Sequence, residues 1–206
     1  MTTVFLPGAG GRRAFWEPVA ARLGGPSTLF AWPGFGDAPP DPMIRSLDDL
    51  AQWLLARLPA GPLDVVAQSM GGVLAMRVAI EHPDRIRRLV LVATSGGSRV
   101  ARSGIDWRAG FRAERSEVPD WFERDQTDLD ERLVQVRAPT LLVFGDADPI
   151  APAAVGEFLR SRIAHARLLV VRTDSHTFAE EQPDEVARAI ADHLGVRTPG
   201  AATEAR

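Results

Sequence analysis

The chain has 206 residues, of which 45% are hydrophobic and 25% charged, and these are the length and composition of one globular domain. It contains no cysteine, and all 24 basic residues are arginine, so disulfides, cysteine nucleophiles and mechanisms that need a lysine amine are excluded. The formal net charge of −3 gives no reason to expect nucleic acid as a partner.

No part of the sequence predicts a membrane or export segment. The apolar runs fall well short of the roughly 18 consecutive residues that a membrane-spanning helix needs. The first residues, MTTVFLPGAGG, lack the basic start of a signal peptide. We therefore expect a cytoplasmic protein without a membrane span.

Short apolar runs alternate with helix-like segments from one end of the chain to the other. The apolar runs are TVFL (3–6), STLFAW (27–32), LDVVA (63–67), RLVLVA (88–93), TLLVFG (140–145) and ARLLVV (166–171). The helix-like segments are 15–23, 50–58 with a cap at Ser46, 73–82 and 183–194. Runs with few polar residues are typical of strands that are buried on both faces of a parallel sheet. The alternation therefore predicts a doubly wound α/β domain over residues 1–195, with 196–206 as a flexible tail.

Residues 97–137 interrupt this alternation, because they contain no convincing strand and lie between the fourth and fifth apolar runs. We expect a lid-like insertion of one to three short helices there. Its aromatic residues are Trp107, Phe111, Trp121 and Phe122. Taken singly they are explained by packing, whereas as a group they predict the roof of a substrate pocket. The first half of the insertion is basic through Arg99, Arg102, Arg108, Arg112 and Arg115, which are either solvated or receive an anionic substrate or acyl carrier.

Polar and glycine-rich segments follow most of the predicted strands, at the edge where open α/β sheets form their sites. The first strand is followed by PGAGG (7–11), and the third by Ser69 within QSMGG. GDADP (145–149) follows the fifth strand, and the sixth is followed by a segment that ends at His176. A hydroxyl, carboxylates and an imidazole are the groups that nucleophilic catalysis by serine requires.

The order Ser69, Asp148, His176, each after its own strand, resembles the α/β-hydrolase family. The resemblance implies that Ser69 is the nucleophile, that His176 is its general base and that Asp148 orients the imidazole. Asp146 is the nearest rival for the acid, because it also lies in GDADP. The segment AQSMG departs from the family's G-x-S-x-G only at Ala67, where the tight turn needs a small side chain.

The same resemblance implies an oxyanion hole, in which the backbone N–H groups of Met70 and Ala9 would stabilise the charge of a tetrahedral intermediate. The loop PGAGG resembles the family's HG-containing loop, with Pro7 in place of the histidine. Family members commonly have two further strands before this loop. We therefore expect a sheet without those two strands, with six parallel strands in the order 2-1-3-4-5-6.

Each of these residues also has a simpler explanation. Ser69 precedes a helix-like segment and would serve as its cap, and Asp148 before Pro149 would serve as a turn residue. The other histidines, His82, His165 and His193, lie at a helix end, in a turn and on the final helix. A dinucleotide site at GAGGRR is not supported, since Arg13 occupies the position of the third glycine.

The sequence predicts a serine hydrolase that cleaves a carboxylic ester or thioester through an acyl-enzyme, with neither cofactor nor metal. Alternatives within the family are an acyl-carrier or CoA thioesterase, a methyl-ester esterase and a hydrolase of carbon–carbon bonds. An alternative of another class is a non-catalytic protein that binds a small ligand and signals through a partner. The expected partner is a small acyl substrate, with an anionic acyl carrier as the second candidate.

Overall fold

Six parallel strands form the sheet in the computed structural model of the chain, which describes residues 1–105 and 118–196. The strands are β1 (Thr3–Leu6), β2 (Ser27–Leu29), β3 (Leu63–Gln68), β4 (Ile86–Val92), β5 (Thr140–Gly145) and β6 (Ala166–Val171). Their order is β2-β1-β3-β4-β5-β6, and every neighbouring pair is parallel. The predicted fold class and strand order are confirmed, with β1 and β3 side by side.

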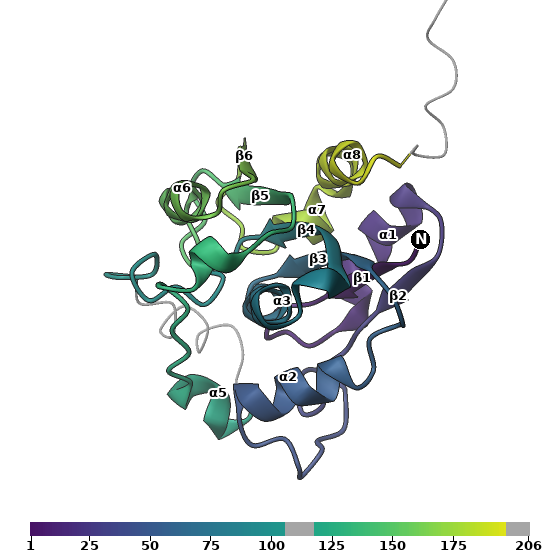
Figure 1. Ribbon diagram of the computed structural model, residues 1–206, viewed down its shortest axis with the longest axis vertical. Helices are drawn as coiled ribbons and strands as arrows, with labels where there is room; N and C mark the ends of the chain where they lie inside the picture. The colour runs from purple at the N-terminus through teal and green to yellow at the C-terminus, as the bar shows by residue number, and fades with distance from the viewer. Residues whose placement is uncertain (106–117, 197–206) are drawn as a thin grey trace, which may run out of the picture.

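Helices cover both faces of this sheet (Figure 1). The α-helices are α1 (Glu17–Leu23), α2 (Leu47–Leu55), α3 (Met70–Glu81), α5 (Asp120–Arg124), α6 (Ala153–Arg162), α7 (Phe178–Glu181) and α8 (Pro183–Leu194). Short 3₁₀ helices are η1 (Arg13–Trp16), η2 (Pro83–Arg85) and η3 (Leu133–Gln135). In Figure 1, α1 and α8 lie together on one face, whereas α2, α3 and α6 lie on the other. The sheet is therefore doubly wound.

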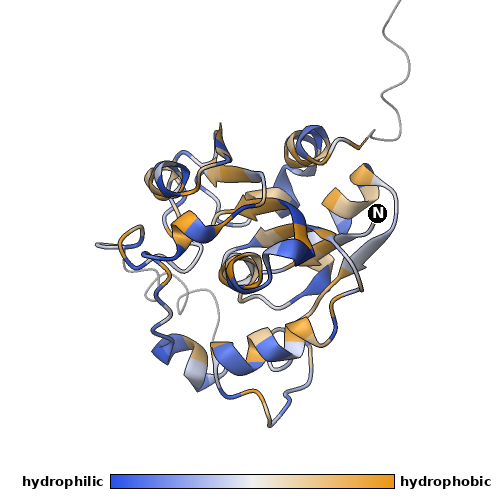
Figure 2. Cartoon of the chain, in the orientation of Figure 1, coloured by the Kyte–Doolittle hydropathy of each residue, from blue (hydrophilic) through white to orange (hydrophobic). Residues whose placement is uncertain are grey.

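The central strands are buried on both faces, as their apolar sequences require. Every residue of β3 and β5 is buried, and Figure 2 shows hydrophobic residues concentrated in the central strands. The helices that cover the sheet are instead amphipathic, with one apolar face toward the sheet. For example, α8 buries Val186, Ile190 and Leu194, which recur at helical spacing. Because the strands are parallel and their middles are buried in this core, their carboxyl ends lie together at one edge of the sheet.

Two buried tryptophans hold the start of the loop that follows β1. Trp16 and Trp32 are both 0% exposed, and a buried indole N–H needs an acceptor. The Nε1 of Trp16 donates to the carbonyl of Leu6 at 2.9 Å, and the Nε1 of Trp32 donates to the carbonyl of Pro7 at 2.8 Å. The segment that leads to Ala9 is therefore fixed relative to the sheet.

Several predicted elements begin or end one to three residues away from their observed bounds, and β2 and α3 are two of them. β2 ends at Leu29 instead of residue 32, because beyond it the N–H of Trp32 bonds to the carbonyl of Gly11, so the chain follows the loop after β1. α3 begins at Met70 instead of residue 73, since the two glycines that follow Met70 belong to its first turn. A further element, α6, lies outside every predicted helix. Its buried residues are Val155, Gly156 and Leu159, so its apolar pattern is short.

The described part of the predicted insertion contains α5 and η3, two short helices. Trp107 and Phe111 lie outside the described residues, and so does the predicted tail from residue 197 onward. Within the two described ranges, no helix is long and apolar enough to cross a membrane. The domain boundaries stay a prediction.

His193, on the last turn of α8, makes the stability of the fold depend on pH. Burial lowers the pKa of His193, with Arg167 and Arg88 acting in the same direction, although the Nε2–H donates to the carbonyl of Pro139 at 3.1 Å. The unfolded chain therefore binds a proton on this imidazole more readily than the folded one. The free energy of unfolding should fall as the pH drops through the unfolded pKa of 6.5, and stop falling below the folded pKa.

Urea unfolding of wild type and His193→Gln across this pH range measures the effect. We expect a shallower pH dependence in the variant, because the titrating group has been removed. The same slope in both proteins would contradict the interpretation of His193.

Candidate active site

Ser69 lies on a sharp turn between β3 and α3. Its backbone has φ 51° and ψ −119°, a conformation that a non-glycine residue adopts only under constraint. One constraint is the hydrogen bond from the Ser69 N–H to the carbonyl of Val92, at 3.1 Å. Another is close packing, because a Cβ on Gly71 would lie 2.5 Å from the carbonyl oxygen of Pro7. The turn presents Ser69 at the carboxyl edge of the sheet.

Ala67 fits this turn although the family pattern has glycine at its position. Ala67 is wholly buried in β3, where it pairs with Leu6 on β1 and Leu91 on β4. The positive φ that favours glycine begins only at Ser69. An added methyl group at residue 67 is therefore accommodated by the core of the sheet.

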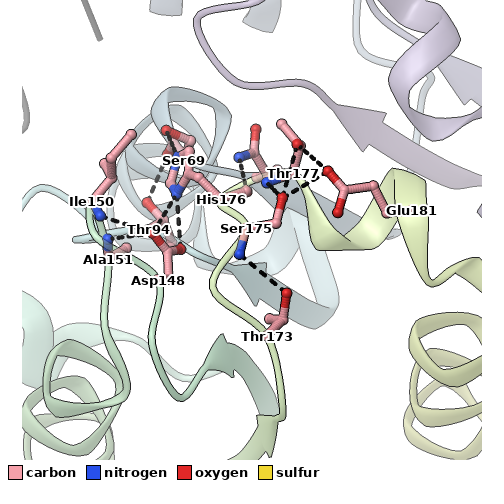
Figure 3. A network of polar contacts seen from close by, with 11 residues as sticks. Ser69, Thr94, Asp148, Ile150, Ala151, Thr173, Ser175, His176, Thr177 and Glu181 are labelled. Atoms are coloured by element: carbon pink, nitrogen blue, oxygen red, sulfur yellow. Dashed lines mark hydrogen bonds and ion pairs between the residues drawn. The ribbon is translucent and has the colours of Figure 1, made fainter. Parts of the chain in front are cut away.

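The structure brings Asp148 and His176 to Ser69 (Figure 3). The Nε2 of His176 lies 3.1 Å from the Oγ of Ser69, and its Nδ1 lies 2.9 Å from Oδ2 and 3.1 Å from Oδ1 of Asp148. The carboxylate is 1% exposed, and its Oδ1 accepts hydrogen bonds from the N–H groups of Ile150 and Ala151. A carboxylate accepts only, so Nδ1 carries the proton and Nε2 is left to accept from the serine hydroxyl.

Asp146, the rival for the acid, has a different partner. Its Oδ1 accepts a hydrogen bond from the N–H of Thr173 at 2.8 Å, and its own N–H donates to the carbonyl of Val171 at 2.9 Å. Asp146 therefore joins the loop after β5 to the loop after β6. The contact with His176 is made by Asp148.

The loop that carries His176 is held on both sides. The Nε2 of Gln68 donates to the backbone carbonyl of His176 at 3.2 Å. The hydroxyls of Ser175 and Thr177 both donate to Oε1 of Glu181 at 2.7 Å (Figure 3). Since these residues flank the histidine, they restrict the position of its ring.

Two hollows open from Ser69. The first is lined by the loop after β1, including Ala9, together with Gln68, His176 and Thr177. The second is lined by Leu47, Ser69, Met70, Val73, Ala93, Thr94, Ser95, Arg102, Phe122, Asp125, Ile150 and Ala151. Phe122 borders both hollows, whereas Trp121 borders neither of them. Both rings pack against Phe35, with centroid distances of 5.5 Å for Trp121 and 5.7 Å for Phe122. The site can therefore hold a substrate that extends on two sides of the serine.

The two predicted oxyanion donors both lie next to Ser69. Ala9 borders the first hollow, and Met70 borders the second. Met70 is the first residue of α3, so its N–H has no carbonyl of the same helix to bond to. An N–H at this place is available to an anion at the helix start.

Comparison with known families agrees with this geometry. Residues 4–130 match the family model of the alpha/beta hydrolase fold, and residues 110–199 match a model described as a TAP-like protein. The chain belongs to the alpha/beta hydrolase family. The predicted family is thereby confirmed.

Curated relatives in this family are hydrolases. A pimeloyl-[acyl-carrier protein] methyl ester esterase of Neisseria meningitidis is 27% identical, over 83% of this chain and 84% of that protein. A 2-hydroxymuconate semialdehyde hydrolase of a Pseudomonas species is 32% identical, over 71% of this chain and 66% of that protein. The prediction of a hydrolase enzyme of the esterase kind is confirmed.

Solved structures show the same fold. A meta-cleavage product hydrolase from Pseudomonas fluorescens superposes with a TM-score of 0.77 at 19% identity, covering 95% of this chain and 90% of that one. The enol-lactonase from Burkholderia xenovorans superposes with a TM-score of 0.75 at 23% identity, covering 94% of this chain and 91% of that one. At these identities the likeness concerns the fold alone.

Three residues at this alpha/beta hydrolase site were not found from the sequence. Gln68 and Glu181 hold the loop of His176, and Thr94 donates a hydrogen bond to the carbonyl of Ser69. Gln68 is part of QSMGG, so the sequence places it beside Ser69 but does not indicate its contact with His176. Thr94 and Glu181 carry no local pattern of this kind.

Proposed function

We propose that the chain cleaves carboxylic esters through an acyl-enzyme formed on Ser69. The observation that carries the proposal is the continuous series of contacts from the Oγ of Ser69 to His176 at 3.1 Å, and from His176 to the buried Asp148 at 2.9 Å. In this proposal residues 1–195 form one hydrolase domain.

In the first half of the reaction, the Oγ of Ser69 attacks the acyl carbon while Nε2 of His176 takes the hydroxyl proton. The imidazolium that forms is stabilised by the carboxylate of Asp148. The tetrahedral intermediate collapses when Nε2 gives its proton to the leaving alcohol. Water then attacks the acyl-enzyme with the help of the same imidazole, and the carboxylic acid leaves.

The negative charge of each tetrahedral intermediate develops on the former carbonyl oxygen. We propose that the backbone N–H groups of Met70 and Ala9 donate to this oxygen. Two observations support this. Ala9 lines the same hollow as Ser69, and Met70 follows Ser69 at the N-terminus of α3, where its N–H has no partner within the helix. Phe122 is proposed to contact the substrate, because it borders both hollows.

Among the substrates of the family, we favour for this chain an ester whose acyl group carries a polar or charged group at the end away from the ester bond. Curated relatives include a pimeloyl-[acyl-carrier protein] methyl ester esterase, and both Arg102 and Asp125 border the second hollow beside Ser69. A thioesterase and a carbon–carbon bond hydrolase remain the alternatives in the same fold. The cytoplasmic location stays a prediction.

A panel of p-nitrophenyl esters and CoA thioesters, with acyl chains from short to long, tests the proposal. Methyl esters with and without a terminal carboxylate form a further matched pair. We expect sustained turnover of the esters. The acyl chain length and terminal group with the highest kcat/KM will show which acyl group the pocket accepts. At most one slow release of product per protein molecule would instead favour the ligand-binding alternative.

A further inference from the structure

Thr94 connects the end of β4 to the turn at Ser69. It is 1% exposed, and its hydroxyl lies 2.6 Å from the carbonyl oxygen of Ser69 and 3.1 Å from the N–H of Gly96. An N–H only donates and a carbonyl only accepts. The hydroxyl proton of Thr94 must therefore point to the carbonyl of Ser69.

Close packing adds to this hydrogen bond. A Cβ on Gly72 would lie 2.5 Å from both Oγ1 and Cγ2 of Thr94, so the first turn of α3 is in direct contact with this side chain. Ala93, the residue before Thr94, has φ 46°, a left-handed conformation that is rare outside glycine. The chain thus departs from the strand at Ala93 and directs Thr94 to the turn.

The carbonyl that Thr94 contacts belongs to the same peptide group as the N–H of Met70. The described residues contain no cis peptide bond, and in a planar trans peptide the C=O and the N–H point in opposite directions. The carbonyl of Ser69 is held by Thr94 and by the N–H of Gly72 at 2.9 Å. Fixing this carbonyl therefore fixes the direction of the Met70 N–H. A hydrogen bond to the oxygen also polarises the peptide and strengthens its N–H as a donor.

We propose that Thr94 is a positioning residue, which orients and polarises the Met70 N–H for the oxyanion of the reaction. The proposal rests on the proposed esterase function and goes beyond it, because it assigns a role to a residue that does not touch the reacting atoms. It predicts that the hydroxyl of Thr94 stabilises the transition state and leaves ground-state binding almost unaffected.

The first test replaces Thr94 by valine, which keeps the shape and removes the hydroxyl, and by serine, which keeps the hydroxyl. On the best ester of the panel, we expect Thr94→Val to lower kcat about tenfold and to change KM less than about twofold. Thr94→Ser should retain kcat to within about threefold. A trifluoromethyl ketone, whose adduct with Ser69 carries an oxyanion, should bind about tenfold more weakly to the valine variant.

A second pair of variants keeps the test decisive if the valine variant does not fold. Thr94→Ala and Thr94→Ser both lack the methyl group and differ only in the hydroxyl, so their ratio of kcat isolates the hydrogen bond. A wild-type kcat in the valine and alanine variants, or a loss confined to KM, would overturn the role of Thr94. Absence of ester turnover by the wild-type protein would overturn the proposed function, and with it this inference.

Discussion

Replacing Ser69 by alanine will lower kcat for ester hydrolysis by about 10⁴–10⁶-fold and leave KM nearly unchanged. The reason is that the Oγ of Ser69 is the atom placed 3.1 Å from Nε2 of His176, at the junction of both hollows. Alanine keeps the turn and removes only this oxygen. The measurement is steady-state hydrolysis of the best ester of the panel, at enzyme concentrations high enough to detect the residual rate.

Ser161→Ala is the matched control for this variant. Ser161 lies on α6, and its hydroxyl bonds to the carbonyl of Phe158 on an exposed surface. We expect this variant to have wild-type kinetics. Ester hydrolysis that survives the loss of Ser69 within about tenfold would exclude Ser69 as the nucleophile.

Replacing Asp148 by asparagine will lower kcat by about 10⁴-fold through the wrong tautomer of His176. The N–H groups of Ile150 and Ala151 both donate to Oδ1 of Asp148. In asparagine this position will be taken by the amide oxygen, so the amide NH₂ will occupy the place of Oδ2, 2.9 Å from Nδ1 of the imidazole. A donor there requires that Nδ1 lose its proton. The proton then moves to Nε2, which can no longer accept from Ser69.

Asp146→Asn is the control that decides between the two aspartates of GDADP. Oδ1 of Asp146 only accepts a hydrogen bond from the N–H of Thr173, and an amide oxygen can accept the same bond. We expect kcat to stay within about threefold of wild type. A large loss in Asp146→Asn together with an active Asp148→Asn would reverse the assignment of the acid.

The strands could be predicted because most of them are buried on both faces, which makes their sequences apolar without interruption. β3 and β5 are of this kind. β2 and α6 were less predictable for two physical reasons. β2 is an edge strand with β1 as its neighbour, so its end depends on where the loop after β1 lies. α6 buries Val155, Gly156 and Leu159, so its apolar pattern is too short to indicate a helix.

The positions of Ser69, Asp148 and His176 could be predicted because each follows a strand, and the carboxyl ends of parallel strands meet at one edge. The residues that support them could not. Thr94 is 25 residues from the carbonyl it contacts, and Gln68 is 108 residues from His176. Contacts across such distances depend on how β3, β4 and the loop after β6 approach one another. No periodicity or spacing in the sequence records that approach.

Covalent labelling by a fluorophosphonate tests the central claim most directly, because an activated serine displaces the fluoride and forms a stable tetrahedral adduct that resembles the tetrahedral intermediate. Intact-mass measurement followed by peptide mapping identifies the modified residue. The account predicts a single phosphonyl adduct on the peptide that contains Ser69, formed by wild type and Ser161→Ala and absent from Ser69→Ala. An unmodified wild-type protein, or an adduct on another residue, would contradict it.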